Sequence, residues 1–419
     1  MKKYQNYHKH TYWSNLSTPD STTSIEDYVN RIVELGHNVL SSVEHGWQGH
    51  YYKVYEAVQK KNLEFKERRK NGENNVPEDL KFIFGTEAYW VKDRFSKDKY
   101  GHIVLLAKNE EGRREINDIL SEANITGYYN KPRIDLELLM SLHKENVFVT
   151  TACVYFWKEY EDIEDILVQL KNHFEDSLYL EVQYHNTDSQ KALNKRILHL
   201  SNKYSIDIIM GCDSHYIYPK DDEERNNYLE GRGIQYDENE IGWYLDYPSY
   251  NEAYRRFKEQ GVLTDDEISR AMDNTNIILD FEDITFDKDI KLPSLYPDKS
   301  QEWKDQKLKQ LINEAWKRDF APYLPKEAKK IYMEGVKNEY NTIVETKMTD
   351  YFLLDYEIVK LGKERGGIIS KTARGSGGSF FINTLLGFSN LNRFEAPVKL
   401  YPERFMSKTR ILKTKSLPD

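Results

Sequence analysis

The sequence predicts an α/β protein in which a βα barrel precedes a smaller, mainly helical region. Short apolar runs alternate with amphipathic stretches over roughly the first 220 residues, a pattern typical of a parallel sheet covered by helices. Histidines and carboxylates follow most of these runs, and active sites lie at the carboxyl ends of strands in such folds. A Leu-Pro pair at residues 292–293 then precedes three longer stretches of helical periodicity.

The composition is that of a globular protein with two or three domains. A length of 419 residues exceeds the roughly 100–200 residues of one domain. The net charge of -9 is dispersed, so a nucleic-acid-binding surface would have to be local. Two cysteines exclude a disulfide framework and fit a reducing cytosol. The polar N-terminus and the lack of a long apolar run predict no signal peptide or membrane span, and hence a cytoplasmic location.

The elements of the first region follow in order. A short opening strand ends at His8 and His10. Periodicity and caps predict helices at residues 24–36, 110–124, 163–174 and 188–204, and strands at 39–43, 81–84, 103–106, 147–150, 178–182 and 206–210. Residues 62–79 are charged and poor in apolar side chains, so we expect a surface excursion there.

The rest of the chain reads as helical. Helices are expected at residues 250–259 and 264–279, and we place the domain boundary between residues 290 and 291. Further helices are expected at residues 301–318, 326–346 and 350–365. A strand starting at residue 366 should then run into a Gly/Ser-rich turn and a short helix at 380–386.

Nine residues are candidate metal ligands. His8 and His10 are spaced i, i+2 and therefore point the same way off a strand, although such a pair alone also fits two half-exposed strand residues. Partners at the ends of later strands are Glu44, His45, Glu87, His102, Cys153, Asp213 and His215. Singly, these would often be core or surface residues. Together they are groups that bind Zn²⁺, Mn²⁺ or Fe, and mixed clusters hold two or three ions about 3.5–4 Å apart.

The Gly/Ser-rich turn is a candidate phosphate site. A turn that leads into a helix leaves backbone N–H groups free for anions, and an arginine there can bind phosphate in a bidentate manner. The candidates are Arg374, Gly375, Ser376 and Ser379.

The order of motifs resembles the polymerase and histidinol phosphatase (PHP) domain of bacterial C-family replicative polymerases, the DNA polymerase III alpha subunits. The matching segments are His8 to Thr11, Glu44 to Gly46, Gly85 to Tyr89, Gly101 to Gly112, Thr151 to Cys153 and Asp213 to Tyr216. The resemblance implies a distorted seven-stranded βα barrel that carries up to three metal ions on the nine candidate ligands. The family usually has Asp where this chain has Glu44, whose carboxylate reaches one methylene further.

The second region resembles the beginning of the polymerase palm, which is of the nucleotidyltransferase type and similar to that of polymerase beta. Residues 349–356 resemble the palm entry, and Arg374 to Ser376 the family's Gly-Arg-Gly-Ser motif. Glu403 to Phe405, with Arg410 downstream, resembles its Glu-Arg-Phe-Leu segment. Residues 370–373 differ from the family's Val-Gly-Pro-Gly.

The resemblance identifies Asp419 as the first of the carboxylates that bind the catalytic Mg²⁺ pair. The other carboxylates and the clamp-binding region are missing, so we expect that the chain cannot polymerise alone. A split gene, an intron or intein boundary, or a fragment would explain this. A C-terminal part on another chain would then complete a bacterial or phage polymerase that binds primer-template DNA, dNTPs and a sliding clamp.

The sequence therefore predicts a PHP domain at residues 1–290 and a truncated palm at residues 291–419. Bound metal ions lower the pKa of water to about 7, which suits phosphoester hydrolysis. We expect 3′–5′ exonuclease or pyrophosphatase activity from the PHP site. The alternatives are a stand-alone metal-dependent phosphoesterase and a non-catalytic scaffold of a split polymerase.

Overall fold

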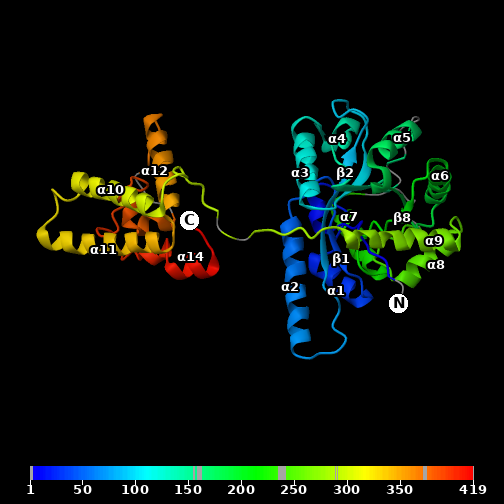
Figure 1. Ribbon diagram of the computed structural model, residues 1–419, viewed down its shortest axis with the longest axis horizontal. Coiled ribbons are helices and arrows are strands. Elements are labelled where there is room, and N and C mark those ends of the chain that lie inside the picture. The colour runs from blue at the N-terminus through cyan, green and yellow to red at the C-terminus, as the bar shows by residue number, and fades with distance from the viewer. Residues whose placement is uncertain are drawn as a thin grey trace. The chain divides into compact units, whose positions relative to one another are not determined.

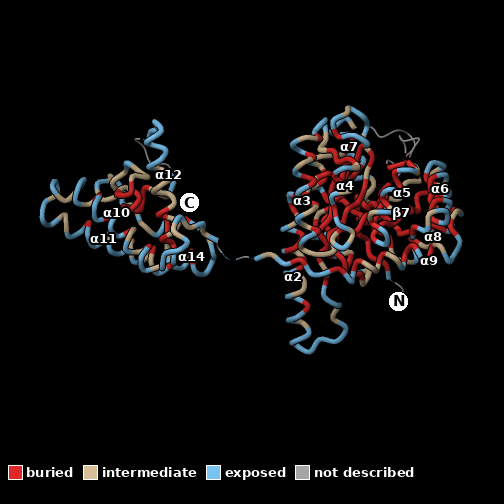
Figure 2. The backbone as a smooth tube through the Cα atoms, turned by 45° about the horizontal axis from the view of Figure 1, so that its top comes forward, coloured by how far each residue is buried: buried red, intermediate tan, exposed pale blue. Residues whose placement is uncertain are grey.

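The chain forms two compact units, Met1–Thr285 and Phe286–Asp419. The computed structural model describes residues 3–153, 156–157, 163–234, 242–287, 289, 291–370 and 375–418. Within the first unit, helices surround a central sheet (Figure 1). Buried residues are concentrated along the strands of that sheet (Figure 2). No helix among the described residues has the length and apolar character needed to cross a membrane.

The first unit is built on a curled, mixed sheet. Its strands are β1 (Val39–Ser42), β2 (Lys81–Trp90), β3 (Gly101–Ala107), β4 (Tyr128–Tyr129), β5 (Lys131–Ile134), β6 (Val147–Thr150), β7 (Leu178–Val182) and β8 (Ile208–Met210). β1 pairs with β2, β6 with β7 and β7 with β8, all in parallel. β3 runs antiparallel to both of its neighbours, β2 and β6. The α/β class and the barrel-like curvature are as expected, but the sheet is not purely parallel.

The N-terminal segment is not a regular strand. It makes one parallel bridge, between Lys9 and Ser214, in which the His10 amide donates to the Ser214 carbonyl at 2.8 Å. Lys9 therefore points away from His8 and His10. Its ammonium group is buried and donates to the Ser41 hydroxyl at 2.7 Å. Burial lowers the pKa of Lys9 to about 7.

Helices cover the sheet of the first unit. They are α1 (Ile25–Leu35), α2 (Tyr51–Lys70), α3 (Glu110–Ile125), α4 (Leu136–Met140), α5 (Ile163–Phe174), α6 (Asp188–Tyr204), α7 (Asp222–Gly231), α8 (Tyr250–Gln260) and α9 (Asp265–Asp273). α1 starts with a capping box between Ser24 and Asp27 and ends at Gly36 in the left-handed conformation. The expected excursion at residues 62–79 is wrong in its first half, because α2 extends through it to Lys70.

The second unit contains helices and no strand among its described residues. Its main helices are α10 (Gln301–Asp319), α11 (Lys326–Glu345), α12 (Thr349–Glu364), α13 (Phe381–Leu385) and α14 (Lys408–Thr414). They enclose a separate core that includes Leu308, Ile312, Tyr332, Ile343, Phe352, Phe381 and Phe405. The strand expected from residue 366 is not formed: the described residues there lie in an exposed coil, and the side chain of Ile368 is 94% exposed.

Candidate metal centre

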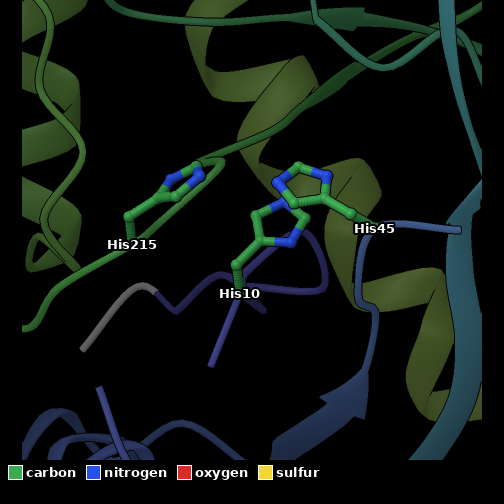
Figure 3. A group of neighbouring side chains, drawn as sticks. All are labelled: His10, His45 and His215. Atoms are coloured by element: carbon green, nitrogen blue, oxygen red, sulfur yellow. The ribbon is translucent and has the colours of Figure 1, made fainter. Parts of the chain in front are cut away.

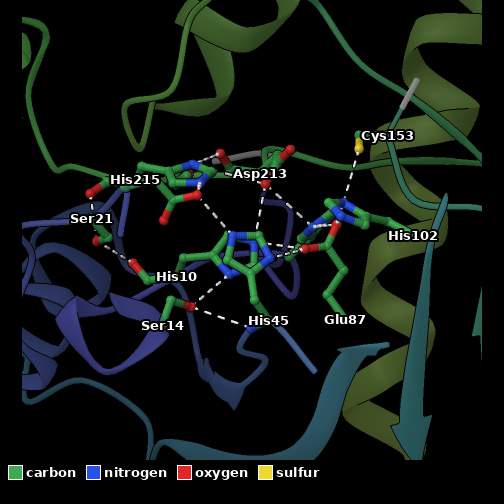
Figure 4. A network of polar contacts seen from close by, with 12 residues as sticks. His10, Ser14, Ser21, His45, Glu87, His102, Cys153, Asp213 and His215 are labelled. Carbon is green, nitrogen blue, oxygen red and sulfur yellow. Dashed lines mark hydrogen bonds and ion pairs between the residues drawn. The ribbon is translucent and has the colours of Figure 1, made fainter. Parts of the chain in front are cut away.

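Seven of the predicted ligands meet at one edge of the sheet. Glu87 lies on β2, and His45 follows β1 and forms a parallel bridge with Glu87. His102 lies at the start of β3, and its register partner on β2 is Tyr89. Because β3 is antiparallel to β2, its first residues lie beside the carboxyl end of β2, and this brings His102 to the site. The N-terminal bridge and the loop after β8 supply His8, His10, Asp213 and His215. Figure 4 shows His10, Asp213 and His215 beside Glu87.

Glu87 is at the centre of this cluster. Its Oε1 lies 3.3 Å from His8 Nε2 and 2.9 Å from His102 Nδ1. Its Oε2 lies 3.4 Å from His10 Nε2 and 2.6 Å from His45 Nδ1. Four imidazoles thus converge on one carboxylate, whose two oxygens face different pairs of rings.

Three overlapping sets of side chains have ligand atoms within 4.8 Å of one another. They are His10, His45 and His215; His8, His10, Glu87 and Asp213; and His45, Glu87 and His102. Figure 3 shows the three rings of the first set facing a common space, with the His10 and His45 rings stacked at 3.9 Å. Glu87 belongs to two sets, as expected of a carboxylate that bridges two ions.

The donor set fits divalent ions. Both oxygens of Glu87, His8 Nε2 and His45 Nδ1 are buried and make no hydrogen bond among the described residues, although they lie within ion-pair distance of one another. Buried polar atoms are rarely left without hydrogen bonds, and convergent nitrogen and oxygen lone pairs are what Zn²⁺, Mn²⁺ or Fe ions bind.

The electrostatics keep the carboxylates ionised. Burial opposes ionisation of Glu87, but His102 and His45 outweigh it and hold its pKa well below the usual range. Burial also opposes ionisation of Asp213, whose pKa is nevertheless lowered by His8 and by the contact with His10. Burial and the neighbouring His45 lower the pKa of His10 to about 4, so this imidazole is neutral at pH 7, as a ligand must be.

Two carboxylates at the site escaped the sequence analysis. Glu181 on β7 accepts a hydrogen bond from Tyr7 at 2.7 Å and lies 2.9 Å from His8 Nδ1, so it orients the His8 ring. Asp20 Oδ2 lies 2.9 Å from His45 Nε2 and 3.3 Å from His215 Nε2. Asp20 lies in a loop, so no strand or helix pattern marks it. Its only sequence signal is its position ten residues after His10. Glu181 sits inside a strand rather than at its end.

Glu44 and Cys153 do not join the three ligand sets. The Glu44 carboxylate accepts a hydrogen bond from the Thr11 hydroxyl at 2.7 Å, another from Ser14, and lies 2.9 Å from His50 Nε2. These contacts occupy the Glu44 carboxylate, which belongs to none of the three sets. The buried Cys153 Sγ lies 3.5 Å from His102 Nδ1, at the margin of the cluster.

The predicted phosphate site is described only in part. Arg374 and Asp419 lie outside the described residues. Gly375 has a φ of 83°, and the turn Ser376–Ser379 is closed by the Ser379 hydroxyl, which donates to the Ser376 carbonyl at 2.7 Å. Arg410 donates to the Arg404 carbonyl at 3.3 Å. The structure therefore shows a hydrogen-bonded turn at Ser376–Ser379, and the phosphate site stays a prediction.

Comparison with known proteins agrees with this architecture. The family model for the PHP domain matches residues 6–185, and that for the bacterial DNA polymerase III alpha NTPase domain matches residues 306–419. DNA polymerase III subunit alpha of Aquifex aeolicus is 25% identical and aligns with 100% of this chain and 36% of its own length. The Borreliella burgdorferi subunit is 26% identical, and the alignment covers 98% of this chain and 34% of that subunit. The probable DNA polymerase YorL of Bacillus subtilis is 23% identical, and the alignment covers 92% of this chain and 34% of YorL.

The curled sheet and its ligand cluster thus define a PHP-domain protein. The chain carries a PHP domain followed by the NTPase domain of bacterial DNA polymerase III alpha, and over its whole length it is similar to the N-terminal part of DNA polymerase III alpha subunits. It spans about a third of the length of the curated relatives that it matches.

Proposed function

We propose that residues 1–290 form a metal-dependent phosphoesterase domain, which acts either as a 3′–5′ exonuclease on the phosphodiesters of nucleic acids or as a pyrophosphatase on the phosphoanhydride of pyrophosphate. The observation that supports this most strongly is the position of the Glu87 carboxylate between four imidazoles. A buried carboxylate with two pairs of nitrogen ligands suits two neighbouring divalent ions, the arrangement used to hydrolyse phosphoesters.

The ligands of the proposed site are His8, His10, His45, Glu87, His102, Asp213 and His215, with Cys153 at the margin. Zn²⁺, Mn²⁺ or Fe ions held there would supply Lewis-acid activation of the phosphoester and of the attacking water. The chain itself fixes the ring orientations. Glu181 holds the Nδ1 side of His8, and His215 Nδ1 lies 2.8 Å from the Asp213 carbonyl, which leaves Nε2 of both rings facing the cluster.

The second unit is proposed to start the palm of a DNA-directed DNA polymerase. Arg374, Gly375, Ser376, Ser379 and Arg410 would contact phosphates of the incoming nucleotide or the primer, and Asp419 would bind Mg²⁺. Primer-template DNA, dNTPs and a sliding clamp are the partners of the complete polymerase. Because the matched relatives are nearly three times as long, polymerisation is proposed to need a C-terminal polymerase part supplied by another chain.

Metal analysis combined with an exonuclease assay tests the hydrolytic proposal. We expect the purified chain to retain Zn, Mn or Fe and to shorten a single-stranded oligonucleotide from its 3′ end. His10→Ala should lower both metal content and hydrolysis. His143→Ala is the matched control, because the His143 side chain is 63% exposed and pairs only with Glu115 among the contacts described. Unchanged metal content in His10→Ala would overturn the site assignment.

A structural role is the second candidate, and burial of the cluster favours it. His8, His10 and Glu87 are 0% exposed, and Asp213 and His215 are below 8%. A site so enclosed could hold ions as a scaffold for the polymerase. Retention of metal without hydrolysis of any phosphoester would support the scaffold. Rapid hydrolysis of small phosphoesters with no action on DNA would instead support a stand-alone phosphoesterase.

A further inference from the structure

A basic and aromatic surface lies beside the metal centre. We define this hairpin surface by six residues of the loop before β3 and of the β4–β5 hairpin: Phe95, Lys97, Lys99, Tyr128, Tyr129 and Lys131. The exposed fractions of Phe95, Tyr128 and Tyr129 are 66%, 63% and 40%. The two segments, residues 92–100 and 128–134, contain four lysines and two aspartates besides the buried Arg94 and Arg133, whereas the whole chain carries a net charge of -9. The positive charge is therefore local, and it coincides with exposed rings.

The hairpin surface is held in shape by the buried Arg133. Its guanidinium group donates to the carbonyls of Arg94 at 2.8 Å, Ser96 at 2.7 Å and Gly127 at 3.1 Å. These bonds fasten the loop before β3 to the hairpin. Gly127 allows the close approach, since a Cβ there would lie 2.2 Å from the Arg133 carbonyl oxygen. The exposed rings thus stand on a preorganised base.

The hairpin surface continues into the rim of the metal centre. Lys131 Nζ lies 3.1 Å from the Thr18 hydroxyl, and Thr18 and Ser17 both contact the Tyr89 hydroxyl, at 2.8 Å and 2.9 Å. The Tyr89 ring lies 5.5 Å from the His102 ring and is stacked at 6.3 Å from the His45 ring. Tyr89 alone therefore separates the residues that contact Lys131 from two of the proposed metal ligands, His45 and His102.

We propose that the hairpin surface binds single-stranded DNA and guides its end to the metal centre. This inference rests on the proposed phosphoesterase for the purpose of the binding, but the binding itself does not require hydrolysis. Unstacked bases would lie on Tyr128, Tyr129 and Phe95, while Lys97, Lys99 and Lys131 would neutralise phosphates. Lys97 already lies 5.8 Å from the centre of the Tyr129 ring, so cation and ring are side by side.

The composition of the surface favours nucleic acid over a protein partner. Protein interfaces are depleted of lysine at their centres, whereas grooves for single strands combine lysine or arginine with aromatic rings. Exposed rings also favour a single strand over a duplex, because bases in a duplex already stack on each other. The edge position of β4, which pairs only with β5 among the described strands, leaves Tyr128 and Tyr129 accessible.

Fluorescence anisotropy of the full chain tests the inference. The probe is a labelled oligothymidylate of about twelve nucleotides, within the usual footprint of such grooves, with 3′ phosphorothioate linkages that resist hydrolysis. We expect Tyr128→Ala/Tyr129→Ala to weaken binding about tenfold or more. Lys97→Ala/Lys99→Ala should weaken it and also reduce its dependence on salt concentration.

A matched control is available at the opposite end of β8. Lys203 Nζ lies 4.8 Å from the centre of the Tyr204 ring, and both residues precede β8, whereas Asp213 follows it. Lys203→Ala/Tyr204→Ala should bind the probe like the parent chain. Thermal melting of each variant checks that it is folded.

The outcomes separate this inference from the proposed function. If no phosphoester is hydrolysed but the hairpin variants alone lose the probe, the phosphoesterase fails and the DNA-binding surface stands. If the folded hairpin variants bind the probe as tightly as the control, or if the parent chain prefers the matching duplex, the inference is overturned. No binding of the probe by the parent chain would also overturn it.

Discussion

At the scale of single residues, Glu87 explains why the other ligands are arranged as they are. It lies on a strand that is buried on both faces, so its charge requires compensation from nearby groups. Four imidazoles surround the carboxylate, and metal ions bound between these rings and the carboxylate would offset its negative charge. His8 and His10 could be predicted from the sequence because of their i, i+2 spacing, and His45 and His102 because each lies beside an apolar run. Asp20 could not, since only the folded loop brings it to His45.

Glu181 provides a test of how the cluster is supported. We predict that Glu181→Gln lowers metal affinity about 10–100-fold without unfolding the chain, because it removes the charge that orients His8 and favours its Nδ1–H tautomer. Metal titration of the apoprotein measures this. Glu230→Gln, on the exposed side of α7, should leave affinity unchanged. Equal affinities of the two variants would show that Glu181 does not support the site.

His37 links folding stability to pH at a distance from the cluster. Burial, with help from Lys3 and Arg31, lowers its pKa from the ordinary 6.5 to about 3. The His37 side chain of the unfolded chain therefore binds a proton below pH 6.5, whereas in the folded chain it binds one only near pH 3. The free energy of unfolding is therefore unaffected by His37 above pH 6.5, and below pH 6.5 it falls by about 1.4 kcal/mol per pH unit because of this residue.

Urea unfolding at pH 8, 6 and 5 checks this linkage, and His37→Gln should show a shallower loss of unfolding free energy toward low pH. His37 Nδ1 lies 2.8 Å from the Tyr247 hydroxyl, so the variant is also expected to be less stable at pH 8. Parallel pH curves for the two proteins would contradict the assignment.

At the scale of elements, the sequence predicted where helices and strands lie better than it predicted the direction in which a strand runs in the sheet. Four elements have the expected bounds: β6, α5, β7 and α6. Their ends are set locally, by the alternation of apolar runs with amphipathic stretches and by helix caps. The direction of β3 could not be read, since an apolar run of a few residues has the same pattern in either direction. α2 was partly missed because only its first part and Phe65 contact the core, while its last turns carry Arg68, Arg69 and Lys70 in solvent.

Gly112 in the first turn of α3 shows how closely that helix lies against the loop before β6. A Cβ at this position would lie 2.1 Å from the Asn146 carbonyl oxygen. We predict that Gly112→Ala lowers the free energy of unfolding by about 1–3 kcal/mol. Gly231→Ala at the end of α7 is the control: nothing lies within 4 Å of the added methyl group, so it should be neutral or slightly stabilising. Chemical denaturation of both variants gives the comparison.

At the scale of the whole molecule, the two units have independent cores. The core residues of the first unit come from the N-terminal segment, the strands and the residues after α9, while those of the second all follow residue 286. The resemblance in motifs predicted both parts, since each has its own set of short, specific segments. The strand predicted from residue 366 was wrong over residues 366–370, because an isolated apolar run forms a strand only where a partner strand is available.

Independent cores imply independent folding. We predict that residues 1–285 expressed alone fold cooperatively and retain the same metal content per chain as the full protein, because every proposed ligand lies within them. Circular dichroism melting and metal analysis measure the two properties. An unfolded or metal-free fragment would mean that the second unit is needed to form the site.

Anomalous X-ray diffraction from crystals grown with Zn²⁺ or Mn²⁺ tests the central claim most directly. The account predicts anomalous peaks at ligand distance from Glu87, with at least one ion held jointly by this carboxylate and the surrounding imidazoles of His8, His10, His45 and His102. A well-ordered Glu87 that contacts these four rings with no anomalous peak between them would contradict it, and the cluster would then be a buried ion-pair network rather than a metal centre.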